Sequence, residues 1–498
     1  MTKRPVLALL TCASVLALAP AAGAVELTKL GSTPAQGEAQ AEISAYHPKT
    51  EQAFVTNAED NTLDIYDFSD PTALGDPVSV DLSPYGAGPN SVDVSKDGLV
   101  AVAVEADPIT APGSVEIFDT DGNHLASFPA GSLPDMVTFA EHDRYLLVAN
   151  EGEALSDDDD PQGSVTVVKL NKKVSKSTVR TAGLAGVPRF GEYRIACPGT
   201  PFAQDAEPEY IAPGGFGTAL VTLQETNAVG LLDIERGRFL YVRGLGYKDH
   251  SLGSNALDPS DRDGQIAINP WPVSGMYQPD AIAAYRHRGL TFYVTANEGD
   301  ARERDGCEEE ARVKDLDLDP AAFPDADELQ EDAALGRLTV TTSNGDSDGD
   351  GVFEELFSFG ARSFSILSPL GGIVYDSGSQ LEEIAAAEQP SIFNASNTEP
   401  AVFDDRSDNK GPEPEGVDVG SLSGRSYAFV ASERQGGIYA YRLDGPSASF
   451  EDYINTRPAD LGPEGVRFVP PAESPTGRAL LLVTNEISGT VAAIDVAP

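Results

Sequence analysis

The sequence predicts an all-β protein, and three observations support this fold class. Short runs rich in Val, Ile, Leu and aromatic residues recur along the chain, separated by turns. The 498 residues include 48 Gly and 36 Pro, the residues that most often interrupt helices and form turns. Long segments with the 3.6-residue hydrophobic period of a helix are scarce, so we expect strands to dominate.

The clearest sequence pattern is a repeat with two parts. The first part is a Pro followed by an acidic or amide residue and a short apolar stretch. It occurs at Pro89-Asn90, Pro134-Asp135, Pro208-Glu209, Pro279-Asp280, Pro414-Glu415 and Pro463-Glu464. The second part is an apolar strand that ends in Asn, Glu or Gln. These strands are predicted at residues 53–57, 101–105, 146–151, 220–225, 293–298, 428–433 and 481–486.

The spacing of the two parts places their carboxylates on one face of the protein. Each Pro-acid pair precedes the end of its strand by about 15 to 22 residues. At about 3.3 Å per residue, this interval accommodates a strand, a turn and a returning strand. Because a hairpin brings its start and its end to the same edge, we expect both sets of carboxylates to lie close together.

Seven strand ends predict seven blades of a β-propeller, with six or eight blades as alternatives. Several of these strands are followed by a short loop and another strand that ends in Asp, at 63–67, 115–119, 229–233 and 491–495. The strand Glu26 to Leu30 is expected to pair with the last blade. That pairing closes the ring and removes an exposed sheet edge.

Residues 1–24 have the pattern of a secretory signal, with Lys3 and Arg4 before an apolar stretch and a small-residue cleavage site at 22–24. A lipoprotein signal at Cys12 is the less favoured alternative, because Thr11 stands where a smaller residue is typical. No later segment approaches the ~20 apolar residues of a membrane helix. We therefore expect residues 25–498 to form one domain, secreted or periplasmic, without a membrane span.

The regular spacing is interrupted by an acidic insertion around residues 301–360. Strands are predicted at 337–342 and 363–367, either as excursions from one face of the ring or as outer strands of the fifth blade. Long connections of this kind often carry function.

The chain is strongly acidic, with 79 Asp and Glu against 34 Lys and Arg and a net charge of −45. This balance argues against nucleic acid as a partner, since phosphate contacts require clustered cations. It fits either solubility in salt or the binding of divalent cations. Beyond the signal, Cys197 and Cys307 are expected to form one disulfide in an oxidising compartment.

The acids of the repeat are the first candidate metal ligands. They are Asp135, Glu209, Asp280, Glu415 and Glu464, with Glu151, Glu298 and Glu486 from the strand ends. Oxygen ligands without His or Cys favour Ca²⁺, with Mg²⁺ second. The alternative is that these carboxylates accept hydrogen bonds from turn N–H groups.

A second candidate calcium site is the run Asp346, Asp348 and Asp350 followed by Gly351, which resembles the opening of an EF-hand loop. Position 12 of that loop is Phe357, so Glu354 or Glu355 would have to supply the closing ligand. The alternative is an acidic surface turn.

Three cations stand inside the acidic phrases: Arg302, Lys410 and Arg434. They fit two roles, as counter-charges between the carboxylates or as a clamp for a phosphate beside a metal. The structural role is favoured.

Many of these phrases resemble the choice-of-anchor I family. The matching phrases include LVANEGE, AEPEYIA, GYKDHS, YQPDAIA, VTANEGDARE, GDSDGDGVFEELFSFGARSFSI and RSDNKGPEPEGV, and the resemblance covers about residues 26–497. It implies a β-propeller in an extracellular or surface location. The family is related to mesenchyme-specific cell-surface glycoproteins, which are associated with biomineralisation, and some relatives are labelled alkaline phosphatases.

These observations favour a secreted calcium-binding propeller that acts as a binding module or associates with a surface or a mineral. The alternative function is a metal-dependent phosphoesterase, similar to alkaline phosphatases or phytases, acting on a phosphorylated ligand through metal-bound water. A third interpretation makes the acidic ring an internally paired structural feature with no ligand.

Overall fold

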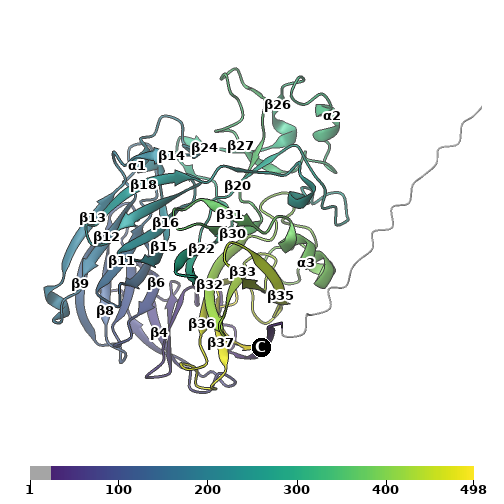
Figure 1. The fold of residues 1–498 in the computed structure, drawn as a ribbon. Coiled ribbons are helices and arrows are strands. Elements are labelled where there is room, and N and C mark those ends of the chain that lie inside the picture. Colours follow the sequence, from purple (N-terminus) through teal and green to yellow (C-terminus); the bar gives the residue numbers. More distant parts are fainter. Residues whose placement is uncertain (1–23) are drawn as a thin grey trace, which may run out of the picture.

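The computed structural model describes residues 24–498, which form a β-propeller with a smaller satellite on one face (Figure 1). The predicted signal at residues 1–24 lies outside the described residues except for Ala24. Seven sheets, each built from four sequential strands or closed by the first strand of the chain, lie around one axis. We number these sheets blade one to blade seven. The prediction of an all-β propeller is confirmed.

The first four blades follow the chain without a large interruption. Blade one contains β2 (Ser44–His47), β3 (Gln52–Asn57), β4 (Thr62–Asp67) and β5 (Val78–Asp81). Blade two contains β6 (Gly88–Val94), β7 (Val100–Glu105), β8 (Pro112–Phe118) and β9 (His124–Ser132). Blade three contains β10 (Pro134–Ala140), β11 (Tyr145–Asn150), β12 (Ser164–Lys169) and β13 (Thr178–Gly183). Blade four contains β15 (Pro208–Gly215), β16 (Thr218–Leu223), β17 (Ala228–Asp233) and β18 (Arg238–Gly244), with β14 (Arg189–Phe190) parallel to β18 at its edge.

The last three blades complete the circle. Blade five contains β21 (Ile282–His287), β22 (Leu290–Asn297), β30 (Ser363–Leu367) and β31 (Ile373–Asp376). Blade six contains β32 (Pro414–Leu422), β33 (Arg425–Ser432), β34 (Ile438–Leu443) and β35 (Ala448–Ile454). Blade seven contains β36 (Pro463–Val469), β37 (Ala479–Asn485), β38 (Thr490–Ala497) and, on its outside, β1 (Glu26–Ser32).

The ring closes in two ways. The innermost strands β2, β6, β10, β15, β21, β32 and β36 contact one another in order, and β36 also contacts β2. In addition, β1 pairs antiparallel with β38, so that Glu26 lies opposite Ala497. The predicted pairing of the N-terminal strand with the last blade is therefore confirmed.

The hydrophobic core lies between the blades. Each of seven apolar clusters combines side chains from two neighbouring blades, and the cluster of blades seven and one completes the series. A strand in the middle of a blade is consequently buried on both faces. This explains why the second strands have continuous apolar runs, as in β37, in which every residue is buried.

The satellite is formed by the segment between blades four and five together with the acidic insertion. Its main sheet has the order β19 (Tyr247–Asp249), β20 (Ser274–Met276), β29 (Phe357–Ser358), β27 (Thr339–Thr341) and β25 (Glu310–Arg312). Two ribbons accompany it: β23 (Glu303–Arg304) with β24 (Cys307–Glu308), and β26 (Asp317–Leu318) with β28 (Val352–Phe353). The strand expected at 363–367 is β30 of blade five, whereas the one expected at 337–342 is β27 of the satellite.

Helices are few and short. The α-helices are α1 (Phe202–Asp205), α2 (Ala326–Leu329) and α3 (Gln380–Glu388). The 3₁₀ turns are η1 (Val174–Lys176), η2 (Gly253–Asn255), η3 (Val313–Asp315) and η4 (Pro390–Ile392). Within residues 24–498, no helix has the length and apolar character needed to cross a lipid bilayer.

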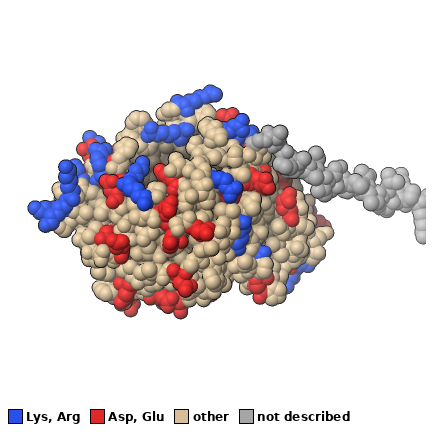
Figure 2. Space-filling model, turned by 90° about the horizontal axis from the view of Figure 1, so that it is seen from below, with Lys and Arg blue, Asp and Glu red and all other residues tan. Residues whose placement is uncertain are grey.

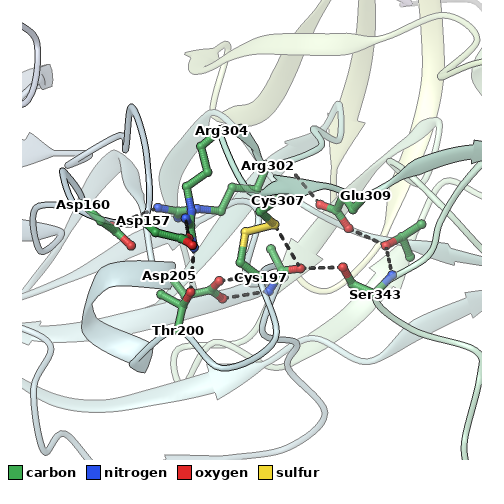
Figure 3. Close-up of a disulfide and its surroundings, with 12 residues drawn as sticks. Asp157, Asp160, Cys197, Thr200, Asp205, Arg302, Arg304, Cys307, Glu309 and Ser343 are labelled. Carbon is green, nitrogen blue, oxygen red and sulfur yellow. Dashed lines mark hydrogen bonds and ion pairs between the residues drawn. A yellow bond between two sulfur atoms is a disulfide. The ribbon is translucent and has the colours of Figure 1, made fainter. Parts of the chain in front are cut away.

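A disulfide between Cys197 and Cys307 joins the satellite to the connection between blades three and four, with 5.8 Å between the Cα atoms. Figure 3 shows the residues around it. The buried carboxylate of Asp205 accepts hydrogen bonds from the N–H groups of Ala196 and Cys197. On the other side, Ser343 Oγ donates to the Ala196 carbonyl at 2.6 Å. The satellite is therefore fixed covalently and by hydrogen bonds.

Candidate metal centre

Each Pro-acid pair lies at a break in strand pairing. In blade three, Pro134 pairs with Asn150 and Met136 pairs with Ala149, which leaves Asp135 outside the ladder. The same register shift occurs at Glu209, Glu415 and Glu464. A β-bulge bends the strand locally and re-aims the extra side chain. The bulge therefore accounts for acids that point away from the blade and toward the axis.

Two further acids occupy the corresponding position without a bulge. The N–H of Asp280 donates to the Ala296 carbonyl, and that of Glu42 donates to the Thr56 carbonyl. Glu42 escaped the sequence analysis because no Pro precedes it. Its position could have been found from spacing alone, since the interval from Glu42 to Asn57 equals that from Asp135 to Asn150.

The Asn and Glu residues at the strand ends have different roles. Asn150 is fully buried, donates to Ser164 and accepts a hydrogen bond from the N–H of Gly131. Asn297 similarly donates to Ser363 and Ser365. These Asn side chains hold their blades together. The Glu that follows them, as at Glu151 and Glu298, is left to face the acids of the bulges.

The structure brings the predicted acids together in two groups. Carboxylate oxygens of Asp135, Glu151 and Glu209 all lie within 4.8 Å of one another. The same is true of Asp280, Glu298 and Glu415. The two remaining predicted acids, Glu464 and Glu486, complete the circle between Glu415 and Glu42, as the electrostatic contacts of Glu464 with Glu42 and Glu486 show.

The first of these groups lacks counter-charges. In residues 24–498, no Lys, Arg or His forms an ion pair with Asp135, Glu151 or Glu209, and no hydrogen bond reaches their side chains. Three neighbouring carboxylate oxygens, of Glu225, Glu415 and Glu464, are also buried without a partner among the described residues. Buried carboxylates in this state are costly unless a proton or a cation compensates them.

The crowding raises the pKa of these groups. Burial, followed by the charge of Glu105, raises the pKa of Asp135 to about 7. Burial and then Glu486 raise the pKa of Glu42 to about 8. The pKa of Glu209 is raised well above its usual value by burial and then by Glu151 and Glu225. Near neutral pH, the mouth of the channel therefore holds protons that a metal ion can replace.

A third group of acids is already compensated. Glu298, Glu413 and Glu433 also have oxygens within 4.8 Å of one another. Lys410 Nζ lies 2.7 Å from Glu298 Oε1, and Arg434 Nε lies 2.9 Å from Glu433 Oε2. Burial would raise the pKa of Glu413, but Lys410 and its two arginine neighbours lower it below its usual value. This part of the ring is a salt-bridge cluster.

The three predicted cations act as counter-charges in this structure. Only 3% of the Arg302 side chain is exposed, and its guanidinium lies 2.7 Å from Glu207 and 3.4 Å from Asp160. The Lys410 side chain is 12% exposed, whereas that of Arg434 is 33% exposed. Arg302 is thus fully committed to internal pairs, and Arg434 keeps the most access to solvent.

The EF-hand-like run forms an exposed loop on the satellite. Oxygens of Asp346, Asp348 and Asp350 lie within 4.8 Å of one another. However, the Asp346 carboxylate accepts hydrogen bonds from the N–H groups of Gly349, Asp350 and Gly351. Glu354 accepts from Ser347. The loop therefore holds its own shape as a turn, and calcium binding there stays a prediction.

Below the acidic mouth, the channel contains a cavity of about 180 Å³. Val137, Ile211 and Val417 line it, together with Tyr210. Because the inner strands run away from the mouth, Arg467 with its partner Asp93, at 3.3 Å, lies toward the opposite end. The apolar wall separates the acidic mouth from that ion pair, so water reaches the carboxylates mainly from one side.

Comparison with known proteins identifies the family. The choice-of-anchor I domain model matches residues 42–446. The chain belongs to the choice-of-anchor I family. This choice-of-anchor I chain extends beyond the matched residues, because β1 and blade seven lie outside that range and still complete the ring.

Two named relatives are similar to this choice-of-anchor I chain over part of its length. Gigasin-3a of Magallana gigas is 36% identical over 185 residues, which are 33% of this chain and 65% of Gigasin-3a. The Mesenchyme-specific cell surface glycoprotein of Strongylocentrotus purpuratus is 28% identical over 208 residues, which are 35% of this chain and 27% of that protein. The matches span less than two thirds of either relative.

Solved structures of similar shape share little sequence. Kuenenia stuttgartiensis hydrazine synthase has a TM-score of 0.49 and 12% identity, covering 93% of this chain and 97% of that one. The WD40 repeats of RRP9 have a TM-score of 0.48 and 11% identity, covering 96% and 99%. With TM-scores below 0.5, the propeller assignment rests on the sheet topology of this chain itself.

Proposed function

We propose that this protein is an extracellular β-propeller module that binds divalent cations, Ca²⁺ in the first place, at its acidic mouth. The observation that carries the proposal is the group Asp135, Glu151 and Glu209, which converges without a counter-charge. Three carboxylates can supply six oxygens, and solvent can complete the shell of Ca²⁺. Mg²⁺ ranks second because it requires a more regular octahedral arrangement.

The energetic case depends on what the cation replaces. Without metal, burial and mutual repulsion hold protons on these carboxyls, as the raised pKa values of Asp135 and Glu209 indicate. A divalent cation removes both the repulsion and the unpaired oxygens at once. Bound metal would stabilise the folded state by mass action, because the ligands come from separate blades and are assembled only by folding.

Membership of the choice-of-anchor I family supports an extracellular or surface location, as does similarity to a protein named a cell surface glycoprotein. In that setting a cation at the mouth can keep open coordination positions for anionic groups of a surface or a mineral. The blade framework would present the cation rigidly, and the neighbouring satellite would limit the size of the ligand.

Calcium titration of the full chain tests the proposal. Protein treated with EDTA is titrated with CaCl₂ or MgCl₂, and binding heat and melting temperature are recorded. We expect saturable binding and a melting temperature that rises with Ca²⁺ more than with Mg²⁺. No binding heat and no change in melting temperature at millimolar Ca²⁺ would contradict the proposal.

A second candidate function is a metal-dependent phosphoesterase. The observation that favours it is the position of Lys410 and Arg434 beside Asp280, Glu298 and Glu415. In this proposal the carboxylates hold the metal, which polarises a phosphoryl oxygen and activates water. The two cations would neutralise the remaining phosphate charge.

A generic phosphomonoester separates the two candidates. Hydrolysis that depends on Ca²⁺, and that is lost in a folded Glu415→Gln variant, would support the enzyme. A protein that binds Ca²⁺ but does not hydrolyse the ester would support the binding module alone.

A further inference from the structure

Strand directions place a cluster of cations on the face opposite the acidic mouth. Asn150, at the mouth, pairs with Ser164, so β12 starts at the mouth and ends on the far face at Lys169. The turn from β12 to β13 therefore lies on the far face. The same reasoning places the turn between β17 and β18 of blade four there, because β17 starts beside the mouth at Ala228.

The turn of blade three is rich in lysine. Lys172, Lys173 and Lys176 are exposed, and within the described part of the chain none of them forms an ion pair. From residue 161 to residue 204 the only acidic residue is Glu192, in a chain whose net charge is −45. The concentration of unpaired cations at this turn is therefore a local reversal of the overall charge.

A hollow of about 320 Å³ adjoins this turn, between blades three and four. Lys169 and Arg180 line it from one face of blade three, as their register with Thr178 and Val167 requires. Arg236 lines it from the turn of blade four. The hollow is held open because Arg180 Nη1 donates to the Glu235 carbonyl at 2.9 Å.

The charges of the hollow are mostly uncompensated. Lys169 Nζ lies over the ring of Tyr145, 5.9 Å from its centroid, and has no acidic partner among residues 24–498. Glu235 lines the same hollow, and Asp233 pairs with Arg236, whose side chain is 68% exposed. We define the basic patch as Lys169, Lys172, Lys173, Lys176, Arg180 and Arg236.

The position of the basic patch agrees with the view from below. In Figure 2, Lys and Arg side chains are densest toward the upper left, the side on which Figure 1 places β12 and β13. Electrostatic interactions are screened within about 8 Å at physiological ionic strength. An anionic ligand in contact with the basic patch would therefore respond to its cations more than to the acids of the far side.

We propose that the basic patch binds an acidic polysaccharide through its carboxylate or sulfate groups. The hollow accommodates one anionic group, and the lysines of the adjoining turn contact further groups along the same polymer. Single-stranded nucleic acid fits less well, because it requires exposed aromatic rings for base stacking. The one aromatic ring of the hollow, Tyr145, is only 6% exposed.

The test uses the full chain in EDTA, so that it does not depend on a metal at the acidic mouth. Binding to immobilised heparin, which carries sulfates, and to polygalacturonate, which carries carboxylates, is measured against neutral dextran and double-stranded DNA. We expect binding to one or both acidic polysaccharides that weakens steeply with added salt, and none to dextran.

A matched pair of variants assigns the binding to this surface. The combined substitution Lys172→Gln, Lys173→Gln and Lys176→Gln is expected to weaken polysaccharide binding by roughly tenfold, at up to about one log unit for each lost charge contact. The control combines Lys49→Gln, Lys96→Gln and Arg425→Gln, which are exposed on the same face in other blades and remove the same charge. The control is expected to bind like the unaltered protein.

Several results would overturn the proposal. They are an absence of binding to both polysaccharides, equal losses in both triple variants, binding that requires Ca²⁺, and tighter binding to DNA than to either polysaccharide. Loss of polysaccharide binding with calcium binding intact would leave the proposed metal centre unaffected.

Discussion

Lys410 Nζ lies 2.7 Å from Oε1 of Glu298, across 112 residues of sequence. This contact divides the acidic mouth into two chemically different parts. Around Glu298 and Glu413, cations arrive from the segment before blade six and neutralise the carboxylates. Around Asp135 and Glu209, no such segment reaches the channel within the described residues. The predictions below depend on this difference.

Replacing Lys410 by Met should destabilise the protein strongly. Lys410→Met leaves Glu298 and Glu413 buried without their cation, and breaking a buried ion pair from one side costs about 3–5 kcal/mol. Urea denaturation in EDTA measures the change. Lys314→Met is the control, since Lys314 pairs with Asp332 at the surface and should cost at most about 1 kcal/mol. Equal effects of the two substitutions would contradict the assignment.

Replacing Glu209 by Gln should have opposite effects with and without metal. In EDTA, Glu209→Gln should raise the free energy of unfolding by ~1–3 kcal/mol, the cost of a buried polar group without a partner. With Ca²⁺, the rise in melting temperature should be smaller than in the unaltered protein, because one ligand is missing. The exposed Glu59→Gln should change neither quantity. A full calcium response in Glu209→Gln would exclude Glu209 as a ligand.

The metal-free protein should become less stable as the pH rises toward 8. Burial, before any charge effect, raises the pKa of both Glu42 and Glu433 to about 8, whereas unfolded Glu titrates near 4.3. Between these values the folded state holds protons that the unfolded state has released, so raising the pH favours unfolding. This stability is complete at low pH and is lost as the pH passes through about 8.

Melting temperatures in EDTA from about pH 5 to pH 9 test this dependence. A double variant, Glu42→Gln with Glu433→Gln, should show a flatter profile above pH 6. Saturating Ca²⁺ should also flatten the profile, because the metal displaces the protons. A melting temperature that rises steadily between pH 6 and pH 8 in EDTA would contradict the raised pKa values.

Removal of the disulfide should loosen the satellite more than the ring. Cys197 and Cys307 are 110 residues apart in the sequence, and loss of a cross-link over such a loop costs about 2–5 kcal/mol. We expect Cys197→Ser with Cys307→Ser to accelerate proteolysis within residues 301–360 while circular dichroism retains its strand signal. Unchanged proteolysis would show that Ser343 and its neighbouring contacts suffice.

The ring could be predicted from sequence because its strongest signals are local. Inner hairpins are buried on both faces, so their apolar runs stand out, and the strand expected at 101–105 agrees with β7. Satellite strands such as β27 could not be predicted as part of a separate sheet. They contain two or three residues, and their pairing is decided by contacts distant in the sequence.

The convergence of acids also followed from spacing, because a hairpin returns to its own edge. Two aspects of the site did not follow. The sequence showed Lys410 and Arg302 in acidic phrases, but only the fold shows which carboxylates they reach. Glu42 shares the position of Asp135 without its Pro, so the motif omitted it. Metal binding itself stays a prediction.

The pairing of β1 with β38 has a practical consequence for handling the molecule. Glu26 lies opposite Ala497, at the end of β38 remote from Asn485 and therefore remote from the acidic mouth. A linker attached at either terminus would emerge from the same rim. Immobilising the protein on a sensor chip by either end would leave its carboxylates turned toward the solution, in one common orientation.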